Sequence, residues 1–202
     1  MDLNEMIRAV QAAVGVEVDG RPGPETWGAV YAALVRPKIQ GLPPAQAIAA
    51  VDERSERAIV TLLPEVRPMA RALVHKAAAA GITVQVLSGL RSYAEQDALY
   101  AQGRTAPGPV VTQARGGHSN HNFGIAFDIG VFSGKRYLPD APQYKAVGAL
   151  GMDLGLEWGG SWKGFVDQPH FQLRPTWAAD LTERAMLAEL RRRHDEGAPV
   201  YA

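Results

Sequence analysis

The alternation of apolar and polar residues divides the chain into a short helical N-terminal part and a longer part that mixes helices with strands. One apolar stripe at helical spacing consists of Met6, Val10, Ala13 and Val14. A turn-rich break follows this stripe, and Pro24 suits the first position of a second helix. Residues 36–44 are rich in proline and predict a linker, and residues 45–51 are a short helical candidate.

The longer part begins with a long predicted helix over residues 53–80, bent at Pro64 and Pro68. Residues 82–88 form the clearest strand pattern of the chain. Further helices are predicted over residues 93–102, 142–155 and 181–194. Residues 105–117 are rich in proline and glycine, and we expect them to form a loop at a substrate rim or lid.

A second strand pattern, over residues 124–132, places one carboxylate on an otherwise small face. In an extended strand Gly124, Ala126 and Asp128 point to the same side, which leaves room for a metal and a substrate. The bulky residues between them point to the other side and predict core: Ile125, Phe127 and Ile129. His170 lies in a run with the same alternation, on the side opposite its apolar neighbours.

Two histidines and one aspartate, His121, Asp128 and His170, make a three-ligand set for zinc. Three protein ligands leave a fourth tetrahedral position for water, which is the layout of a catalytic site. Asp167 precedes His170 by three residues and would take a proton from that water as general base, then return it as general acid. The same ligands accept other first-row divalent ions. His118 could bind the metal instead of His121, and a lone histidine beside an apolar strand is often a hydrogen-bonded core residue, so the residues alone leave the site open.

The composition narrows the range of partners and compartments. The chain of 202 residues has no cysteine, so it has neither disulfides nor thiolate metal ligands. Its formal net charge is zero, which argues against nucleic acid as the main partner. The N-terminus lacks a basic region followed by an apolar core, and no window approaches a transmembrane span. We therefore expect a monomer made in the cytoplasm without a signal peptide and without stable membrane insertion.

Several motifs occur in the order found in one family of bacterial wall peptidases. They are Ser119-x-His121-x6-Asp128, Asp167-x-x-His170, the end of the strand at residues 86–92, and the segment at residues 156–160. Together they resemble the zinc D-alanyl-D-alanine carboxypeptidases and the L-alanyl-D-glutamate endopeptidases of phage endolysins, from about residue 53 to about residue 173. The resemblance implies an α+β fold of the hedgehog/DD-peptidase type, with a small antiparallel sheet and flanking helices, preceded by a small helical module.

The resemblance also implies roles for individual residues. It assigns the zinc ligand to His121 and leaves His118 at the rim. Arg91 has the position of an arginine that contacts the substrate carbonyl or the oxyanion, where a fixed cation stabilises developing charge. The alternative for Arg91 is a salt-bridged turn residue. We expect substrate contacts from four further side chains, which are Ser88, Ser119, Gln96 and Trp162. The alternatives for these four are ligand support, solvation or packing.

The leading hypothesis is a zinc-dependent endolysin that hydrolyses an amide bond of the peptidoglycan stem peptide. The resemblance favours the endopeptidase branch, whose acid in the x-x-His motif is aspartate, as Asp167 is here, and it therefore implies the L-alanyl-D-glutamate bond. One alternative is a D-alanyl-D-alanine carboxypeptidase, and another is a wall-binding zinc module without catalysis. Endolysins commonly leave the cell through a holin pore, so the resemblance implies this route to the wall.

The first part of the chain carries a motif of its own. Asp19-Gly20-x-x-Gly23-Pro24-x-Thr26-Trp27 resembles the signature of peptidoglycan-binding-like helical modules. Such modules usually have three helices, and residues 43–52 would supply the third. The alternative is a helical hairpin that only packs on the catalytic domain. We expect a wall-binding-like module at residues 1–42, a linker or short helix at residues 43–52, and the zinc peptidase domain with its C-terminal helix at residues 53–202.

Overall fold

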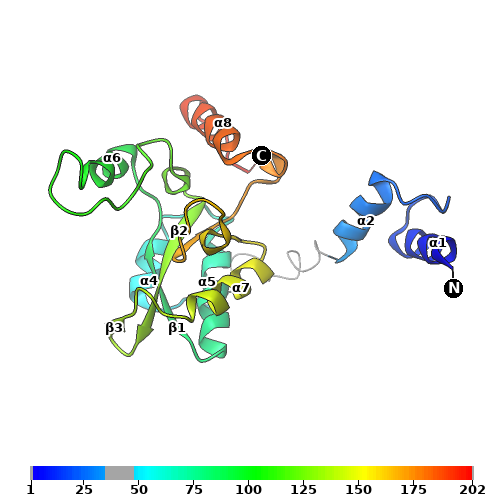
Figure 1. Cartoon of the computed structure of the whole chain (residues 1–202), viewed down its shortest axis with the longest axis horizontal. Helices are drawn as coiled ribbons and strands as arrows, with labels where there is room; N and C mark the ends of the chain where they lie inside the picture. The colour runs from blue at the N-terminus through cyan, green and yellow to red at the C-terminus, as the bar shows by residue number, and fades with distance from the viewer. Residues whose placement is uncertain (1, 35–47, 202) are drawn as a thin grey trace. The chain divides into compact units, whose positions relative to one another are not determined.

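The computed structural model describes residues 2–34 and 48–201 of the chain. The chain separates into two compact units, Met1–Pro44 and Ala45–Ala202 (Figure 1). The predicted linker at residues 36–44 lies outside the described residues, as does most of the helical candidate that follows it. The described end of that candidate, residues 48–51, is not helical.

The first unit contains the two predicted helices, α1 (Leu3–Val14) and α2 (Pro24–Leu34). Part of the α1 stripe is exposed, since Met6 is 44% and Val10 39% accessible. A buried amide holds the turn between the helices instead. Gln11 donates to Asp19 Oδ1 at 2.7 Å and accepts a hydrogen bond from the Gly20 amide at 2.8 Å.

The second unit is built on an antiparallel sheet in the order β1-β2-β5-β4. These strands are β1 (Thr83–Ser88), β2 (Ala126–Ser133), β5 (His170–Gln172) and β4 (Glu157–Trp158), and the short β3 (Arg136–Tyr137) also pairs with β2. Two helices, α4 (Glu53–Ile59) and α5 (Arg67–Ala79), pack against β1, and α7 (Tyr144–Asp153) packs against α5 and β4 (Figure 1). This arrangement confirms the predicted α+β fold with a small antiparallel sheet and flanking helices.

The predicted single helix over residues 53–80 is wrong, because α4 and α5 are separate helices. Pro64 has no amide hydrogen to continue α4, so the chain leaves the helix before it. Leu63 instead donates its amide to Gly124 O at 3.0 Å, which ties the turn to the segment before β2. Pro68 lies in the first turn of α5, where a missing N–H does no harm.

The remaining elements of the second unit are helical. They are α6 (Tyr93–Ala101), η1 (Asn120–Phe123), η2 (Gly159–Ser161), η3 (Thr176–Ala178) and α8 (Glu183–Glu196). The helices predicted at residues 93–102, 142–155 and 181–194 are confirmed, with small shifts at their ends. The predicted strand at residues 124–132 starts two residues late, because Gly124 has a φ of 67° and ends η1.

The core lies on one face of the sheet and confirms the predicted alternation. Ile125, Phe127 and Ile129 are fully buried, and the ring of Phe127 stacks on Phe171 with centroids 5.8 Å apart. α7 approaches this layer closely, since a Cβ on Gly151 would lie 2.4 Å from the Phe171 ring. The other face of β2 and β5 is therefore left for polar residues. Across residues 2–34 and 48–201, no helix is both long enough and apolar enough to cross a bilayer.

Candidate active site

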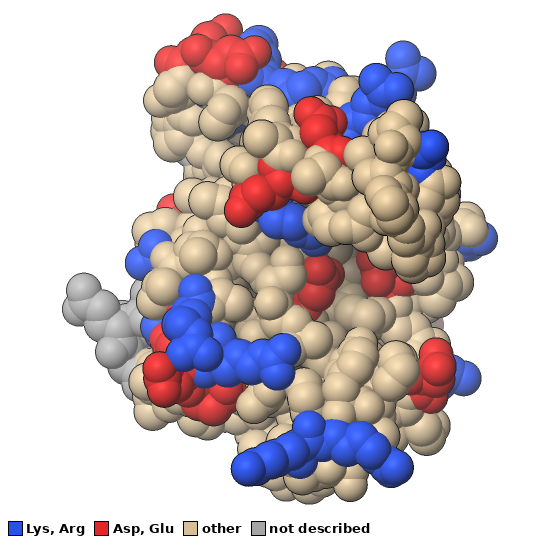
Figure 2. Space-filling model, turned by 90° about the vertical axis from the view of Figure 1, so that its left-hand side faces the viewer, with Lys and Arg blue, Asp and Glu red and all other residues tan. Residues whose placement is uncertain are grey.

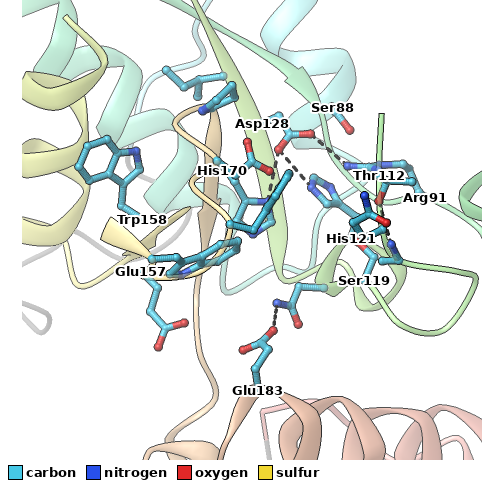
Figure 3. Close-up of a pocket in the computed structure, with 18 of the residues that line it drawn as sticks. Ser88, Arg91, Thr112, Ser119, His121, Asp128, Glu157, Trp158, His170 and Glu183 are labelled. Atoms are coloured by element: carbon cyan, nitrogen blue, oxygen red, sulfur yellow. Dashed lines mark hydrogen bonds and ion pairs between the residues drawn. The ribbon is translucent and has the colours of Figure 1, made fainter. Parts of the chain in front are cut away.

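The three predicted zinc ligands come from neighbouring elements and meet on the polar face of the sheet. Asp128 on β2 lies directly opposite His170 on β5, so both side chains point to the same side. His121 comes from η1, which precedes β2. Figure 3 shows the carboxylate of Asp128 between the two imidazoles. Ser88, the last residue of β1, lies opposite Asp128 on its other side.

The ligand atoms are close enough to share one ion. Asp128 Oδ1 lies 3.2 Å from His121 Nε2 and 3.4 Å from His170 Nδ1. One atom from each of the three side chains lies within 4.8 Å of the others. A tetrahedral zinc with bonds of about 2.0–2.1 Å places its ligands about 3.3 Å apart. The two separations from Asp128 Oδ1 therefore match edges of a zinc coordination shell.

The hydrogen bonds on the far side of each imidazole decide which nitrogen faces Asp128 without a proton. His121 Nδ1 lies 2.8 Å from Gly89 O, a carbonyl that only accepts, so Nδ1 carries the proton and Nε2 presents a lone pair. His170 Nε2 lies 2.9 Å from Gln172 Oε1, which leaves Nδ1 toward Asp128. Two lone pairs and a carboxylate oxygen repel one another unless a cation lies between them. The donor set thus fits a divalent metal.

The charge on Asp128 is held in place on both of its oxygens. Burial alone would raise its pKa, but in the metal-free protein the positive charges and hydrogen bonds of protonated His121 and His170 hold the pKa well below the usual range, and a bound cation would take the place of those protons. Its second oxygen accepts from Arg91 Nη2 at 3.1 Å (Figure 3). Asp128 is therefore an anion ready to bind a cation, with its orientation set by Arg91.

Two predicted substrate-contacting residues make contacts within the protein. Arg91 lines the cavity, but it bonds Asp128 and donates through Nη1 to Gln96 Oε1 at 2.9 Å. Gln96 is fully buried behind Arg91, and its Nε2 donates to Ala114 O at 2.9 Å and to Thr112 Oγ1 at 3.3 Å. The amide of Gln96 thus joins Arg91 to the rim loop, and Gln96 is absent from the lining of the cavity.

Asp167, the predicted general base, lines the same cavity as the ligand group. Its backbone is fixed, because its amide donates to Gly159 O at 3.0 Å and its carbonyl accepts from the His170 amide at 3.2 Å. Burial, and then the negative charge of Asp128, raise the pKa of Asp167. A dication held by the ligands would act in the opposite direction. Asp167 is thus a carboxyl group in the wall of the cavity, with a pKa that is raised in the metal-free protein.

The cavity measures about 1160 Å³ and is lined by most of the predicted site residues. Ser88, Ser119 and Trp162 line it with the ligands, and the ring of Trp162 lies 5.0 Å from that of His170. His118 is exposed at the lining, beside Arg191, and is not part of the ligand group. Figure 2 shows acidic side chains set into a hollow on the face it displays, with lysine and arginine side chains above and below it.

One group of polar residues near the ligands, centred on Gln172, was not predicted from the sequence. Gln172 is fully buried and bonds His170, and further polar side chains bond Gln172 in turn. The available signal was spacing, because Gln172 follows His170 by two residues on a strand and therefore shares its face.

Comparison with known proteins places the chain in a family. A profile of peptidase family M15, described as D-alanyl-D-alanine carboxypeptidase, matches residues 112–173. The peptidoglycan L-alanyl-D-glutamate endopeptidase CwlK of Bacillus subtilis (strain 168) is 41% identical over 124 residues, which cover 56% of this chain and 74% of the relative. The chain belongs to the M15 peptidase family. The crystal structure of the L-Ala D-Glu endopeptidase ChiX of Serratia marcescens matches with a TM-score of 0.49 and 25% identity, over 63% of this chain and 91% of that one.

Membership of the M15 family agrees with the chemistry of the site. M15 peptidases are zinc-dependent, and the described part of the chain brings His121, Asp128 and His170 together as a group that could hold the ion. The predicted cofactor, zinc, is thereby confirmed. The predicted class of enzyme, a metallopeptidase, is confirmed as well.

Proposed function

We propose that this M15 peptidase is a zinc-dependent peptidoglycan endopeptidase that hydrolyses the L-alanyl-D-glutamate bond of the stem peptide. The observation that carries the proposal is the convergence of His121 Nε2, Asp128 Oδ1 and His170 Nδ1 beside Asp167, in a cavity large enough for a peptide. The L-alanyl-D-glutamate endopeptidase activity for which the Bacillus relative is named supports the choice of bond.

In this proposal each side chain has a separate task. His121, Asp128 and His170 hold zinc, which supplies a Lewis acid that makes water nucleophilic near neutral pH. Asp167 takes the proton of the attacking water and returns it to the leaving amine.

The remaining predicted residues bind or orient. Arg91 keeps Asp128 in place and adds positive charge at the cavity wall, where it would stabilise negative charge on the substrate oxygen. Ser88 and Ser119 would donate hydrogen bonds to the peptide, and Trp162 would form an aromatic wall beside His170. Gln96 would act through Arg91, because its side chain is buried behind it.

A D-alanyl-D-alanine carboxypeptidase is the second candidate, favoured by the description of the matching family profile. Both activities use the same residues, so only the products distinguish them. Mass spectrometry of digested, purified wall decides between them. A stem severed after its first residue supports the endopeptidase, and released alanine supports the carboxypeptidase.

The catalytic assignment is tested with Asp167→Asn, beside Asp153→Asn as a control. Asp153 is an exposed carboxylate at the end of α7 and does not line the cavity. We expect Asp167→Asn to keep zinc and lose hydrolysis, and Asp153→Asn to keep both. His121→Ala should lose both zinc and hydrolysis. Full hydrolysis by Asp167→Asn would refute the role of the general base.

The finer parts of the proposal rest on sequence motifs. We propose that the enzyme is a bacteriolytic endolysin of phage type that acts as a monomer and is released through a holin pore, and that residues 1–42 bind the wall. A version that begins at residue 45, the start of the second unit, tests the last point. Equal sedimentation of both versions with purified wall would contradict it.

A further inference from the structure

Next to the ligand group lies a closed ring of five polar side chains from separate parts of the second unit, and all of them except Gln172 also line the cavity. The members are Asn120 of η1, Glu157 of β4, Gln172 of β5, Arg174 just after β5, and Glu183, the first residue of α8. Gln172 Nε2 donates to Glu157 Oε2 at 2.6 Å, and Arg174 Nε donates to the other oxygen of Glu157. Arg174 Nη2 donates to Glu183 Oε2 at 2.9 Å. Asn120 Nδ2 closes the ring by donating to both Glu183 Oε1 and Gln172 Oε1, and Figure 3 shows Glu183 reaching up from α8 to this bond.

The charged members of the ring determine which way its two amides face. Carboxylates only accept hydrogen bonds, so Glu157 must receive the nitrogen of the Gln172 amide. Glu183 must likewise receive the nitrogen of Asn120. Arg174 only donates, and it holds both carboxylates in these positions. The oxygen of the Gln172 amide is therefore forced to the remaining side, toward His170.

The orientation of the Gln172 amide decides which nitrogen of His170 is free to bind the metal. Gln172 Oε1 can only accept, so His170 Nε2 must carry the ring proton at a separation of 2.9 Å. In the neutral imidazole, His170 Nδ1 is then left as a lone pair beside Asp128 Oδ1, 3.4 Å away. His121 obtains the same result from a backbone carbonyl, Gly89 O, which cannot reverse. A side-chain amide can rotate by half a turn and exchange the positions of its oxygen and nitrogen. His170 therefore needs the ring to fix its hydrogen-bond partner, whereas His121 does not.

We propose that Gln172, held in one orientation by this ring, is a positioning residue that selects the metal-binding tautomer of His170 and couples the start of α8 to the zinc site. Gln172 is fully buried and does not line the cavity, so it acts through His170 and not on substrate. The inference rests on the proposed zinc site. It is independent of which peptide bond is cut.

The test measures zinc binding and tautomer state in the full chain, without substrate. Gln172→Leu removes the acceptor for His170 Nε2 and leaves the three ligands in place. We expect zinc affinity, measured by competition with a chromogenic chelator, to fall about 10- to 100-fold. In the metal-free protein, at a pH above the raised pKa of His170, ¹⁵N-resolved imidazole spectra should show a single Nε2–H tautomer for His170 in the wild type, and a mixture in the variant.

Ser55→Ala is the control for a general loss of stability. Ser55 is fully buried in the same unit and accepts from the Val86 amide at 2.9 Å, away from the cavity lining. It should lower the melting temperature and leave zinc affinity and the His170 tautomer unchanged. A fall in zinc affinity with Ser55→Ala equal to that with Gln172→Leu would overturn the proposal. Unchanged affinity and tautomer in Gln172→Leu would overturn it as well.

Glu157→Gln keeps the proposal testable if Gln172→Leu does not fold. An amide at this position can present either its oxygen or its nitrogen to Gln172, so the direction of the ring is lost while its shape is kept. We expect a smaller fall in zinc affinity and a partial mixture of tautomers. A single Nε2–H tautomer together with wild-type affinity would refute the proposal. Failure of the wall-hydrolysis assay alone would instead refute the proposed function, because neither readout here uses wall.

Discussion

A largely buried ion pair between the first two helices of the second unit should make the stability of that unit depend on pH. Arg71 donates from Nε to Glu56 Oε1 at 2.8 Å and from Nη2 to Oε2 at 2.7 Å, and the Val51 amide adds a third hydrogen bond at 3.0 Å. The two side chains are only 18% and 19% accessible. The hydrogen bonds from Arg71 outweigh the effect of burial, so the pKa of Glu56 is lowered.

The perturbation is Glu56→Gln, which keeps the shape of the side chain and removes its charge. A hydrogen bond to a charged group contributes about 1.5–3 kcal/mol, and an amide at this position keeps part of the interaction. We therefore expect a loss of about 2 kcal/mol, which for a unit of this size corresponds to a melting temperature lower by about 4–8 °C. The control is Glu53→Gln on the same helix, since the Glu53–Arg57 pair is 90% and 66% exposed and should change the melting temperature by no more than about 1 °C.

The sign of the pH dependence follows from the direction of the pKa shift. A carboxyl group whose pKa is lower in the folded state stabilises the fold above its unfolded value, here 4.5, and this contribution disappears as pH falls through the folded value. Thermal denaturation followed by circular dichroism should therefore show a large difference between wild type and Glu56→Gln at pH 7, and a small one near pH 3. A difference that is the same at both pH values would refute the reasoning.

Further predictions concern packing, charge and metal. Gly151→Ala should destabilise the second unit by about 1–3 kcal/mol in chemical denaturation, because the new methyl group meets the Phe171 ring. Gly28→Ala, at a helical site with nothing within 4 Å, should stabilise the first unit by about 0.5–1 kcal/mol. Burial raises the pKa of Asp167, so this carboxyl group stabilises the fold below pH 3.8, its unfolded pKa, and loses that contribution as pH rises through the folded pKa. Asp167→Asn should therefore raise the melting temperature of the metal-free protein at pH 7. Chelation should abolish hydrolysis and lower the melting temperature, and added zinc should restore both.

The ligand group could be predicted from sequence because strand alternation and short spacing fix local geometry. Asp128 and His170 lie on the polar face of their strands, and the fully buried Phe127 and Ile129 lie on the other, as a period of two requires. Which of the two histidines, His118 or His121, joins them could not be decided from residues alone, since they are close together in the sequence and both precede the strand. The family resemblance supplied that choice.

The arrangement around the ligands could not be predicted, because it depends on contacts across long stretches of chain. Gln96 faces Arg91 and the rim loop only because Thr112 and Ala114 of that loop return beside α6, and a helical period does not reveal that. The hydrogen-bonded ring joins η1, β4, β5 and α8, elements that are far apart in the sequence. The break between α4 and α5 was missed because the apolar spacing continues through it, although Pro64 marks its place.

The amide of Gln96 gives the cavity one stiff side. Three hydrogen bonds in series connect the edge of the cavity to a metal ligand. Gln96 donates to Ala114 O in the rim loop, Arg91 donates to Gln96, and Arg91 also donates to Asp128. A peptide that pushes the loop outward must pull on the carboxylate that holds the ion. Stem peptides with bulky or branched side chains should then be hydrolysed slowly even when they bind well. Across a series of such substrates, kcat would fall while KM stays nearly constant.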